Sequence, residues 1–128
     1  MQQRATRRAA LATLRRAIEL GVNFIDTADS YGPYASEELI AEALTPYPSD
    51  LVVATKGGWQ RPGPGQWLHN ASPKHLEAAV EGSLKRLRLE RIDLYQLHVP
   101  DPAVSFDASI GVLARMRDAG KIRHIGLS

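Results

Sequence analysis

Four helical patterns alternate with four short apolar runs along the whole sequence, and this alternation limits the fold more than any other feature. The apolar runs, each expected to form a strand, lie near residues 22–26, 51–56, 92–98 and 122–127. Before each run, apolar side chains recur at three- and four-residue spacing, which is typical of an amphipathic helix. Alternating helices and strands favour parallel strands joined by crossover helices. The sequence therefore predicts an α/β fold with adjacent parallel strands in chain order, in a single domain over residues 1–128.

Residues with known preferences for helix ends bound these helices. Gly21 and Gly120 are placed to end the first and the last helix, because glycine readily adopts the left-handed conformation found there. Ser72 followed by Pro73 is typical of a helix N-terminus. Ser36 is likewise predicted to cap the second helix.

Two of the predicted strands are interpreted as buried. Residues 51–55 form a nearly continuous apolar run, which is typical of a strand covered on both faces of a parallel sheet. Residues 22–25 are interpreted as a shorter buried strand of the same kind.

The connection over residues 57–71 is unusually long and rich in glycine and proline. A loop of that length is usually functional or mobile. It carries Trp59 and Trp67, and it should overhang the end of the preceding strand. We therefore take Trp59 as a candidate substrate contact, the alternative being that both indoles only fasten the loop to the surface.

Composition argues against several classes of protein. The absence of cysteine excludes disulfides and thiolate metal sites and fits a reducing compartment, so we expect a cytoplasmic protein. The four histidines lack ligand spacing, so no metal site is predicted. Sixteen basic and fourteen acidic residues are interspersed, which argues against a nucleic-acid surface, and no stretch approaches the roughly 18 apolar residues of a membrane span. The Arg-rich residues 1–20 superficially resemble a mitochondrial presequence, although an amphipathic helix explains the same pattern.

Polar side chains follow three of the predicted strands. Asp26 and Tyr31 follow the first, Lys56 the second and His98 the third. Parallel strands of repeated strand-helix units present their carboxyl ends at one face, so these four residues are candidates for one active site. Taken singly, each also has a structural explanation: a turn aspartate, a surface tyrosine, a solvated lysine and a hydrogen-bonded histidine. Asp29, in the loop between Asp26 and Tyr31, is interpreted as a turn residue.

Four segments resemble the aldo-keto reductase family. Residues 21–32, Gly-Val-Asn-Phe-Ile-Asp-Thr-Ala-Asp-Ser-Tyr-Gly, are similar to the family signature in which an aspartate ends a strand and a tyrosine follows five positions later. Residues 53–56, Val-Ala-Thr-Lys, and 93–98, Asp-Leu-Tyr-Gln-Leu-His, resemble the segments ending in the family's lysine and histidine. Residues 121–128 resemble the segment that runs into the Ser-Asn pair holding the nicotinamide carboxamide. The matches keep the family's order and cover essentially the whole chain.

The resemblance implies NADPH-dependent reduction of an aldehyde or ketone to an alcohol. It makes Asp26, Tyr31, Lys56 and His98 the catalytic tetrad, and it places Asp26 and Ser128 at the cofactor. Hydride addition puts negative charge on the carbonyl oxygen, so an acid must donate a proton there, which suits Tyr31. A nearby ammonium stabilises a phenolate, so Lys56 could assist Tyr31 while Asp26 orients the lysine. His98 could align the carbonyl, and the hydride itself has to come from the cofactor.

The family's barrel has eight strands and typically about 250 residues. The expected fold is therefore a partial, half-length TIM (β/α)8 barrel of four helix-strand units, corresponding to the catalytic half. The other half is where the family builds most of its contacts to the cofactor phosphates. Four parallel strands leave two sheet edges and an apolar face unpaired. We therefore expect a homo-oligomer or a complementary half-barrel chain, with at least roughly 1,000 Å² buried in total.

Two alternatives of a different class stay open at this point. One is a non-catalytic regulatory or binding protein on a reductase scaffold, and the other is a truncated or self-associating half barrel that catalyses nothing. Cofactor titration separates the reductase from both alternatives, and the size of the protein in solution reveals self-association.

Overall fold

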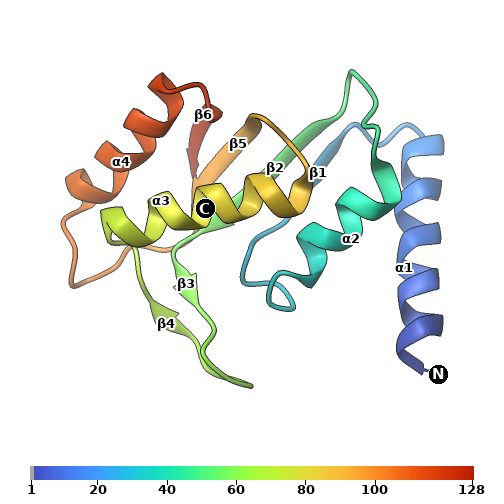
Figure 1. Ribbon diagram of the computed structural model, residues 1–128, viewed down its shortest axis with the longest axis horizontal. Coiled ribbons are helices and arrows are strands. Elements are labelled where there is room, and N and C mark those ends of the chain that lie inside the picture. Colours follow the sequence, from blue (N-terminus) through green and yellow to red (C-terminus); the bar gives the residue numbers. More distant parts are fainter. Residues whose placement is uncertain (1) are drawn as a thin grey trace.

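The computed structural model describes residues 2–128, with the side chains of the first helix described from Thr6 onward. The elements in chain order are α1 (Gln2–Glu19), β1 (Phe24–Asp26), α2 (Ala35–Leu44), β2 (Val52–Gly57), β3 (Trp59–Gln60), β4 (Leu68–His69), α3 (Pro73–Leu87), β5 (Ile92–Leu97), α4 (Phe106–Asp118) and β6 (Ile122–Leu127) (Figure 1). Within the described part of the chain, no helix is both long and apolar enough to cross a membrane.

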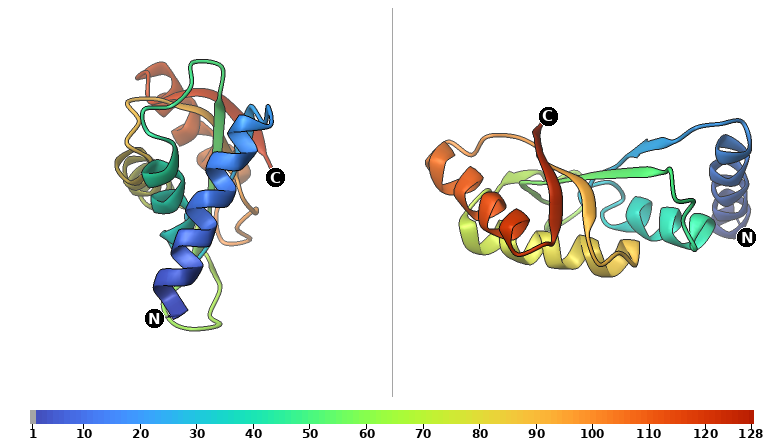
Figure 2. Two further views of the ribbon diagram at one scale, coloured as in Figure 1. Left: turned by 90° about the vertical axis from the view of Figure 1, so that its right-hand side faces the viewer. Right: turned by 90° about the horizontal axis from the view of Figure 1, so that it is seen from above.

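The main sheet has four strands in the order β1-β2-β5-β6, and every neighbouring pair is parallel. The predicted adjacency, direction and order of the strands are therefore confirmed. The helices α2, α3 and α4 gather on one side of this sheet (Figure 2). The sheet is thus covered by helices on one side only.

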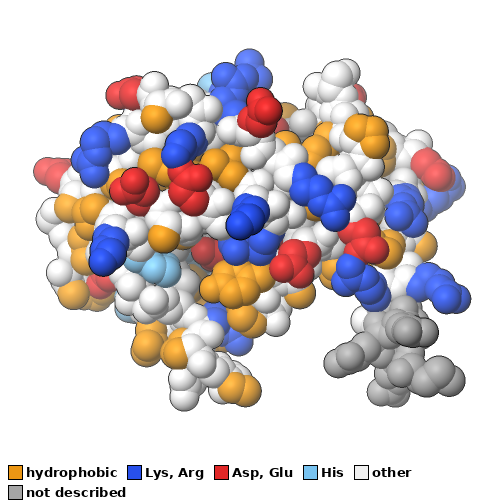
Figure 3. Space-filling view, in the orientation of Figure 1, with side chains coloured by type: hydrophobic (Ala, Val, Ile, Leu, Met, Phe, Trp, Pro, Cys, Tyr) orange, Lys and Arg blue, Asp and Glu red, His pale blue; other side chains and the backbone are white. Residues whose placement is uncertain are grey.

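On the face seen in Figure 3, basic and acidic side chains are interspersed over the helices.

Most of the predicted helix ends agree with the structure. Gly21 and Gly120 have φ values of 97° and 83°, the left-handed conformation expected after a helix. The Ser72 hydroxyl accepts a hydrogen bond of 3.2 Å from the backbone N–H of His75, and Pro73 occupies the first helical position. Gly21 and Gly120 thus follow the ends of α1 and α4, whereas Ser72 and Pro73 begin α3.

The prediction that Ser36 caps α2 is wrong. Tyr34 is the N-cap residue, in the left-handed conformation with φ 67° and without a side-chain cap. Ser36 already lies in the first turn, where its hydroxyl shares a hydrogen bond of 2.7 Å with the Thr27 hydroxyl. The serine therefore ties the helix to the loop after β1, a tertiary contact that the sequence pattern does not reveal.

Two apolar clusters hold the helices against the sheet. The larger joins α3, α4, β5 and β6 through Leu76, Val80, Tyr95, Leu113, Ile122 and their neighbours, and the smaller joins α2, β2 and the end of α3 through Ile40, Leu44, Leu51, Val53 and Leu87. β2 is buried along nearly all of its length, as predicted. Gly57 packs so closely on β5 that an added Cβ would lie 2.1 Å from the Tyr95 hydroxyl. This contact permits only glycine after the candidate lysine of β2 unless Tyr95 moves.

The prediction that residues 22–25 are buried is wrong. Phe24 is 51% exposed and Val22 is also exposed, as is Leu127 at the other edge of the sheet. β1 and β6 are the two edge strands, and the described helices lie on only one side of the sheet. Apolar side chains that point to the other side therefore have no cover.

The connection over residues 57–71 is more ordered than a loop, because β3 and β4 pair in antiparallel fashion within it. Trp59 stacks on His69 with ring centroids 4.5 Å apart and meets the Trp67 edge at 5.5 Å. The Arg61 guanidinium carbon lies 3.9 Å from the centroid of the Trp67 ring. These aromatic contacts stabilise a hairpin within the segment that the sequence interpretation treated as a long loop.

Candidate active site

An ion pair links the ends of β1 and β2. The Lys56 ammonium donates hydrogen bonds of 3.0 Å to Asp26 Oδ1 and 3.0 Å to the Thr27 carbonyl oxygen. Asp26 pairs with Ala54 in the sheet, so Lys56, two residues further on, reaches back across the strand end. The lysine side chain is 7% exposed and the aspartate side chain 45%. A nearly buried ammonium is stable here because both an opposite charge and a carbonyl oxygen meet it.

Gln96 is a contact of this ion pair that the sequence interpretation missed. Its side-chain N–H₂ donates a hydrogen bond of 2.9 Å to Asp26 Oδ1, so that oxygen accepts bonds from both Lys56 and Gln96. In the sheet Gln96 is the register partner of Lys56. Alternation along a strand could have found it, because Gln96 stands two residues before His98 and extended residues two apart share a face.

Tyr31 and His98 complete the cluster from two other segments. Tyr31 lies in the loop between β1 and α2, and His98 follows β5, where its backbone N–H bonds the Gly57 carbonyl oxygen at 2.9 Å. Their rings meet edge to face with centroids 5.9 Å apart. The Lys56 ammonium lies 5.3 Å from the centroid of the Tyr31 ring. The structure thus brings together all four residues predicted from the strand ends.

The surroundings of His98 favour the neutral imidazole. Burial and the Lys56 ammonium both lower the pKa of His98, and the Asp26 carboxylate opposes them more weakly. Nδ1 of His98 is buried without a hydrogen-bond partner among the described residues. A neutral imidazole carries one N–H, so His98 is suited to donate a hydrogen bond and is a poor source of protons at neutral pH.

The β3–β4 hairpin lies beside this cluster. The Trp59 ring meets His98 edge to face at 6.4 Å, whereas Trp67 packs on Trp59. Arg61 donates a hydrogen bond of 2.9 Å to the Ser30 carbonyl oxygen, which ties the hairpin to the loop that carries Tyr31. Trp59 is therefore the tryptophan with a place next to the candidate site.

Ser128 lies at the end of β6. Its backbone N–H bonds the Leu97 carbonyl oxygen at 3.1 Å, which sets it next to the end of β5 and one residue beyond the paired strand. It is exposed, and its position at the carboxyl edge of the sheet is shared with Asp26, Lys56 and His98. No group of three or more potential metal ligands occurs among the residues that the structure describes.

Asp29 is more than the turn residue that the sequence suggested. Its backbone does form turn contacts, with the Asp29 carbonyl oxygen accepting from the Tyr34 N–H at 2.8 Å. Its side chain, however, is 5% exposed, and Oδ1 has no described partner. Burial, with a smaller contribution from Glu37, raises the pKa of Asp29 to about 7. A buried carboxyl group of this kind cannot be recognised from a turn-forming sequence.

Comparison with known proteins supplies independent evidence. The model of the aldo/keto reductase family matches residues 1–128. An uncharacterized oxidoreductase of Schizosaccharomyces pombe is 51% identical over 120 residues, which cover 94% of this chain and 39% of that protein. Pyridoxine 4-dehydrogenase of Escherichia coli is 44% identical over 128 residues, which cover 95% of this chain and 45% of the relative.

Solved structures agree with the sequence comparison. An aldo-keto reductase from Bacillus halodurans, in its holo form, matches with a TM-score of 0.88 and 33% identity, over 95% of this chain and 41% of the reductase. An aldo-keto reductase from Klebsiella pneumoniae in complex with NADPH matches with a TM-score of 0.81 and 26% identity, over 96% of this chain and 40% of that protein. The chain spans less than half the length of these relatives, in agreement with the predicted half barrel. It belongs to the aldo/keto reductase family.

Proposed function

We propose that this chain is the proton-donating half of an NADP(H)-dependent reductase that converts aldehydes or ketones to alcohols. The observation that carries the proposal is the nearly buried Lys56 ammonium next to the Tyr31 ring. It lies 3.0 Å from the Asp26 carboxylate and 5.3 Å from the centroid of the Tyr31 ring. A fixed positive charge at this position can stabilise the negative charge that develops during carbonyl reduction.

Tyr31 acts as the general acid in this proposal. Reduction of a carbonyl places negative charge on its oxygen, and the phenol donates a proton to that oxygen as the charge develops. Lys56 stabilises the phenolate that remains. Asp26 and the Thr27 carbonyl oxygen fix the ammonium, and Gln96 fixes Asp26. The positive charge therefore stays beside Tyr31 without reorganisation during the reaction.

His98 and Trp59 position the substrate. The neutral His98 imidazole donates its N–H to the same carbonyl oxygen and aligns it with Tyr31, which leaves Tyr31 as the proton source. Trp59, edge to face with His98, supplies an apolar wall for the remainder of a small-molecule substrate.

The chemistry of the available polar groups fits the nicotinamide end of the cofactor. The Asp26 carboxylate is half exposed and Ser128 stands at the same edge of the sheet, so these two residues would hold the carboxamide end. The nicotinamide supplies the hydride when it is bound. The preference for NADPH over NADH rests on the relatives, one of which is solved with NADPH.

The proposal includes a second half that completes the barrel. The edge strands β1 and β6 expose backbone for pairing, and they carry the exposed apolar residues Phe24 and Leu127. A complementary half barrel, or a second copy of this chain, would cover them and bury at least roughly 1,000 Å². It would also contribute the contacts to the cofactor phosphates.

Turnover by a completed barrel tests the proposed activity. We expect the Schizosaccharomyces pombe relative, with this chain in place of its matched segment, to consume NADPH only when an aldehyde is present, with one alcohol formed per NADPH lost. The intact relative serves as the control for the assay. A folded chimera that binds NADPH without consuming it, under conditions in which the relative is active, would favour a non-catalytic binding protein.

A further inference from the structure

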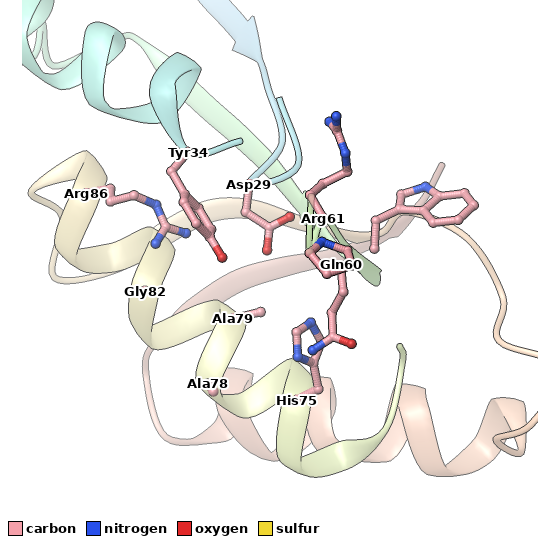
Figure 4. A pocket seen from close by; sticks show the side chains of 11 residues that line it. Asp29, Tyr34, Gln60, Arg61, His75, Ala78, Ala79, Gly82 and Arg86 are labelled. Atoms are coloured by element: carbon pink, nitrogen blue, oxygen red, sulfur yellow. The ribbon is translucent and has the colours of Figure 1, made fainter. Parts of the chain in front are cut away.

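A cavity of about 340 Å³ lies outside the sheet, between α3, the loop after β1 and the β3–β4 hairpin. Its size falls at the lower end of the range for small-molecule sites. Ala78, Ala79 and Gly82 of α3 form a floor of small residues, and Tyr34 and Gln60 stand on opposite sides (Figure 4). The cavity has a polar lining at both ends.

Arg86 presents a fixed guanidinium at one end of this cavity. Its Nε donates a hydrogen bond of 2.8 Å to Glu37, and its Cζ lies 4.2 Å from the centroid of the Tyr34 ring. Neither Nη atom has a hydrogen-bond acceptor among the described residues. A Cβ on Gly82 would lie 2.9 Å from Nη1, so glycine leaves the space that this guanidinium occupies. Two adjacent Nη groups held in one plane are a fork for a carboxylate.

Asp29 also lines the cavity, from the loop after β1, and lies beside Tyr34 (Figure 4). Its side chain is more than nine-tenths buried and Oδ1 has no described partner. The charged or titratable groups around it are Glu37 of α2, Arg86 of α3 and Tyr95 of β5. Burial raises the pKa of Asp29 to about 7, so its protonated form, a hydrogen-bond donor, is populated at neutral pH.

The other end of the cavity adds a neutral polar group. His75 has a buried Nε2 without a partner in the described part of the chain, and burial lowers the pKa of this histidine. The Arg61 guanidinium is engaged through Nε with the Gln66 carbonyl oxygen and through Nη1 with the Ser30 carbonyl oxygen. Arg86 is therefore the cation in this lining whose two Nη groups have no acceptor among the described residues, although its charge also balances that of Glu37.

We propose that this cavity binds a small organic monocarboxylate, with the carboxylate on the Arg86 Nη groups and the body of the molecule over Ala78 and Ala79 toward His75. Protonated Asp29 donates a hydrogen bond to the carboxylate. The volume admits a molecule of about the size of benzoate and excludes a folded peptide chain. The loop over residues 26–34 contributes Asp29 and Tyr34 to this cavity and Asp26 and Tyr31 to the candidate active site. A molecule bound in the cavity would therefore touch the loop that bears the candidate acid.

Calorimetric titration of the intact chain with benzoate, and with benzamide as the uncharged control, tests this site. We expect saturable binding of benzoate and none of benzamide. Burial raises the pKa of Asp29 to about 7, and deprotonation removes its donor and adds a negative charge beside the bound carboxylate, so benzoate affinity should fall between pH 6 and pH 8. Asp29→Asn keeps a neutral donor at both pH values, and its affinity should stay constant.

Substitutions around the cavity locate the bound molecule. Arg86→Lys keeps a positive charge beside Glu37 and removes the fork, so it should weaken benzoate at least about tenfold. Ala78→Leu fills the cavity and should abolish binding, whereas Glu77→Leu, an exposed α3 residue that does not line the cavity, should leave it unchanged. Absence of saturable binding in the folded chain overturns the proposal. The proposal is also overturned if Tyr31→Phe no longer binds benzoate while Ala78→Leu still does, because benzoate would then lie in the candidate active site.

Discussion

Replacing Tyr31 with phenylalanine should lower the kcat for aldehyde reduction by about 10²- to 10⁴-fold in the completed barrel. The substitution removes the proposed proton donor and leaves the ring, and therefore its edge-to-face packing on His98, in place. The KM for the cofactor should change little, because the hydroxyl acts on the carbonyl oxygen. Steady-state NADPH oxidation across a range of aldehyde and cofactor concentrations measures both quantities.

Tyr47→Phe is the matched control for this experiment. The Tyr47 hydroxyl bonds the Leu87 carbonyl oxygen at 2.7 Å, in the connection before β2 and away from the carboxyl edge of the sheet. Its loss should cost some stability and no activity. Undiminished turnover by Tyr31→Phe would refute Tyr31 as the acid, and equal losses in both variants would point to a general effect on folding.

Arg86→Leu should destabilise the protein by about 3 kcal/mol or more. Glu37 is completely buried, and its two carboxylate oxygens accept from the Arg86 Nε at 2.8 Å and from the Thr55 hydroxyl at 2.7 Å. Removing the guanidinium leaves a buried negative charge without its counter-ion. Urea unfolding, followed by circular dichroism, measures the change in the free energy of unfolding.

The double variant Glu37→Gln/Arg86→Leu separates loss of the charge pair from loss of packing. A neutral amide can still contact Thr55, so we expect the double variant to recover most of the stability that the single variant loses. If the single and double variants are equally unstable, the cost comes from the packing of the Arg86 side chain on Tyr34 and the buried charge is not its cause.

The sequence was sufficient for the architecture and for the four candidate residues. Apolar runs bounded by glycine and by helix caps mark the strands, and parallel pairing then brings Asp26, Lys56 and His98 to one edge. Tyr31 could be predicted to lie at the same edge because its loop begins directly after Asp26. These predictions depend on short-range patterns and on one topological rule, which is why a single sequence supports them.

Other features depend on contacts between distant segments and were missed. The exposure of Phe24 depends on which side of the sheet the helices cover, and the burial of Asp29 depends on α2, α3 and β5 closing around it. The sequence around Ser36 is typical of a helix cap, but in the structure the Ser36 hydroxyl shares a hydrogen bond with the Thr27 hydroxyl. The hairpin in the segment predicted as a loop likewise depends on the pairing of Trp59 with His69, which are separated by nine residues.

Mixing this chain with a separately expressed complementary half tests most directly whether it is the proton-donating half of a reductase. The part of the Schizosaccharomyces pombe relative that lies outside the matched segment is a suitable partner, since the matched segment is 51% identical. We expect neither half alone to oxidise NADPH with an aldehyde, and the mixture to gain that activity as the two halves form a one-to-one complex. Formation of the complex without any NADPH oxidation, while the intact relative is active in the same assay, would contradict this account.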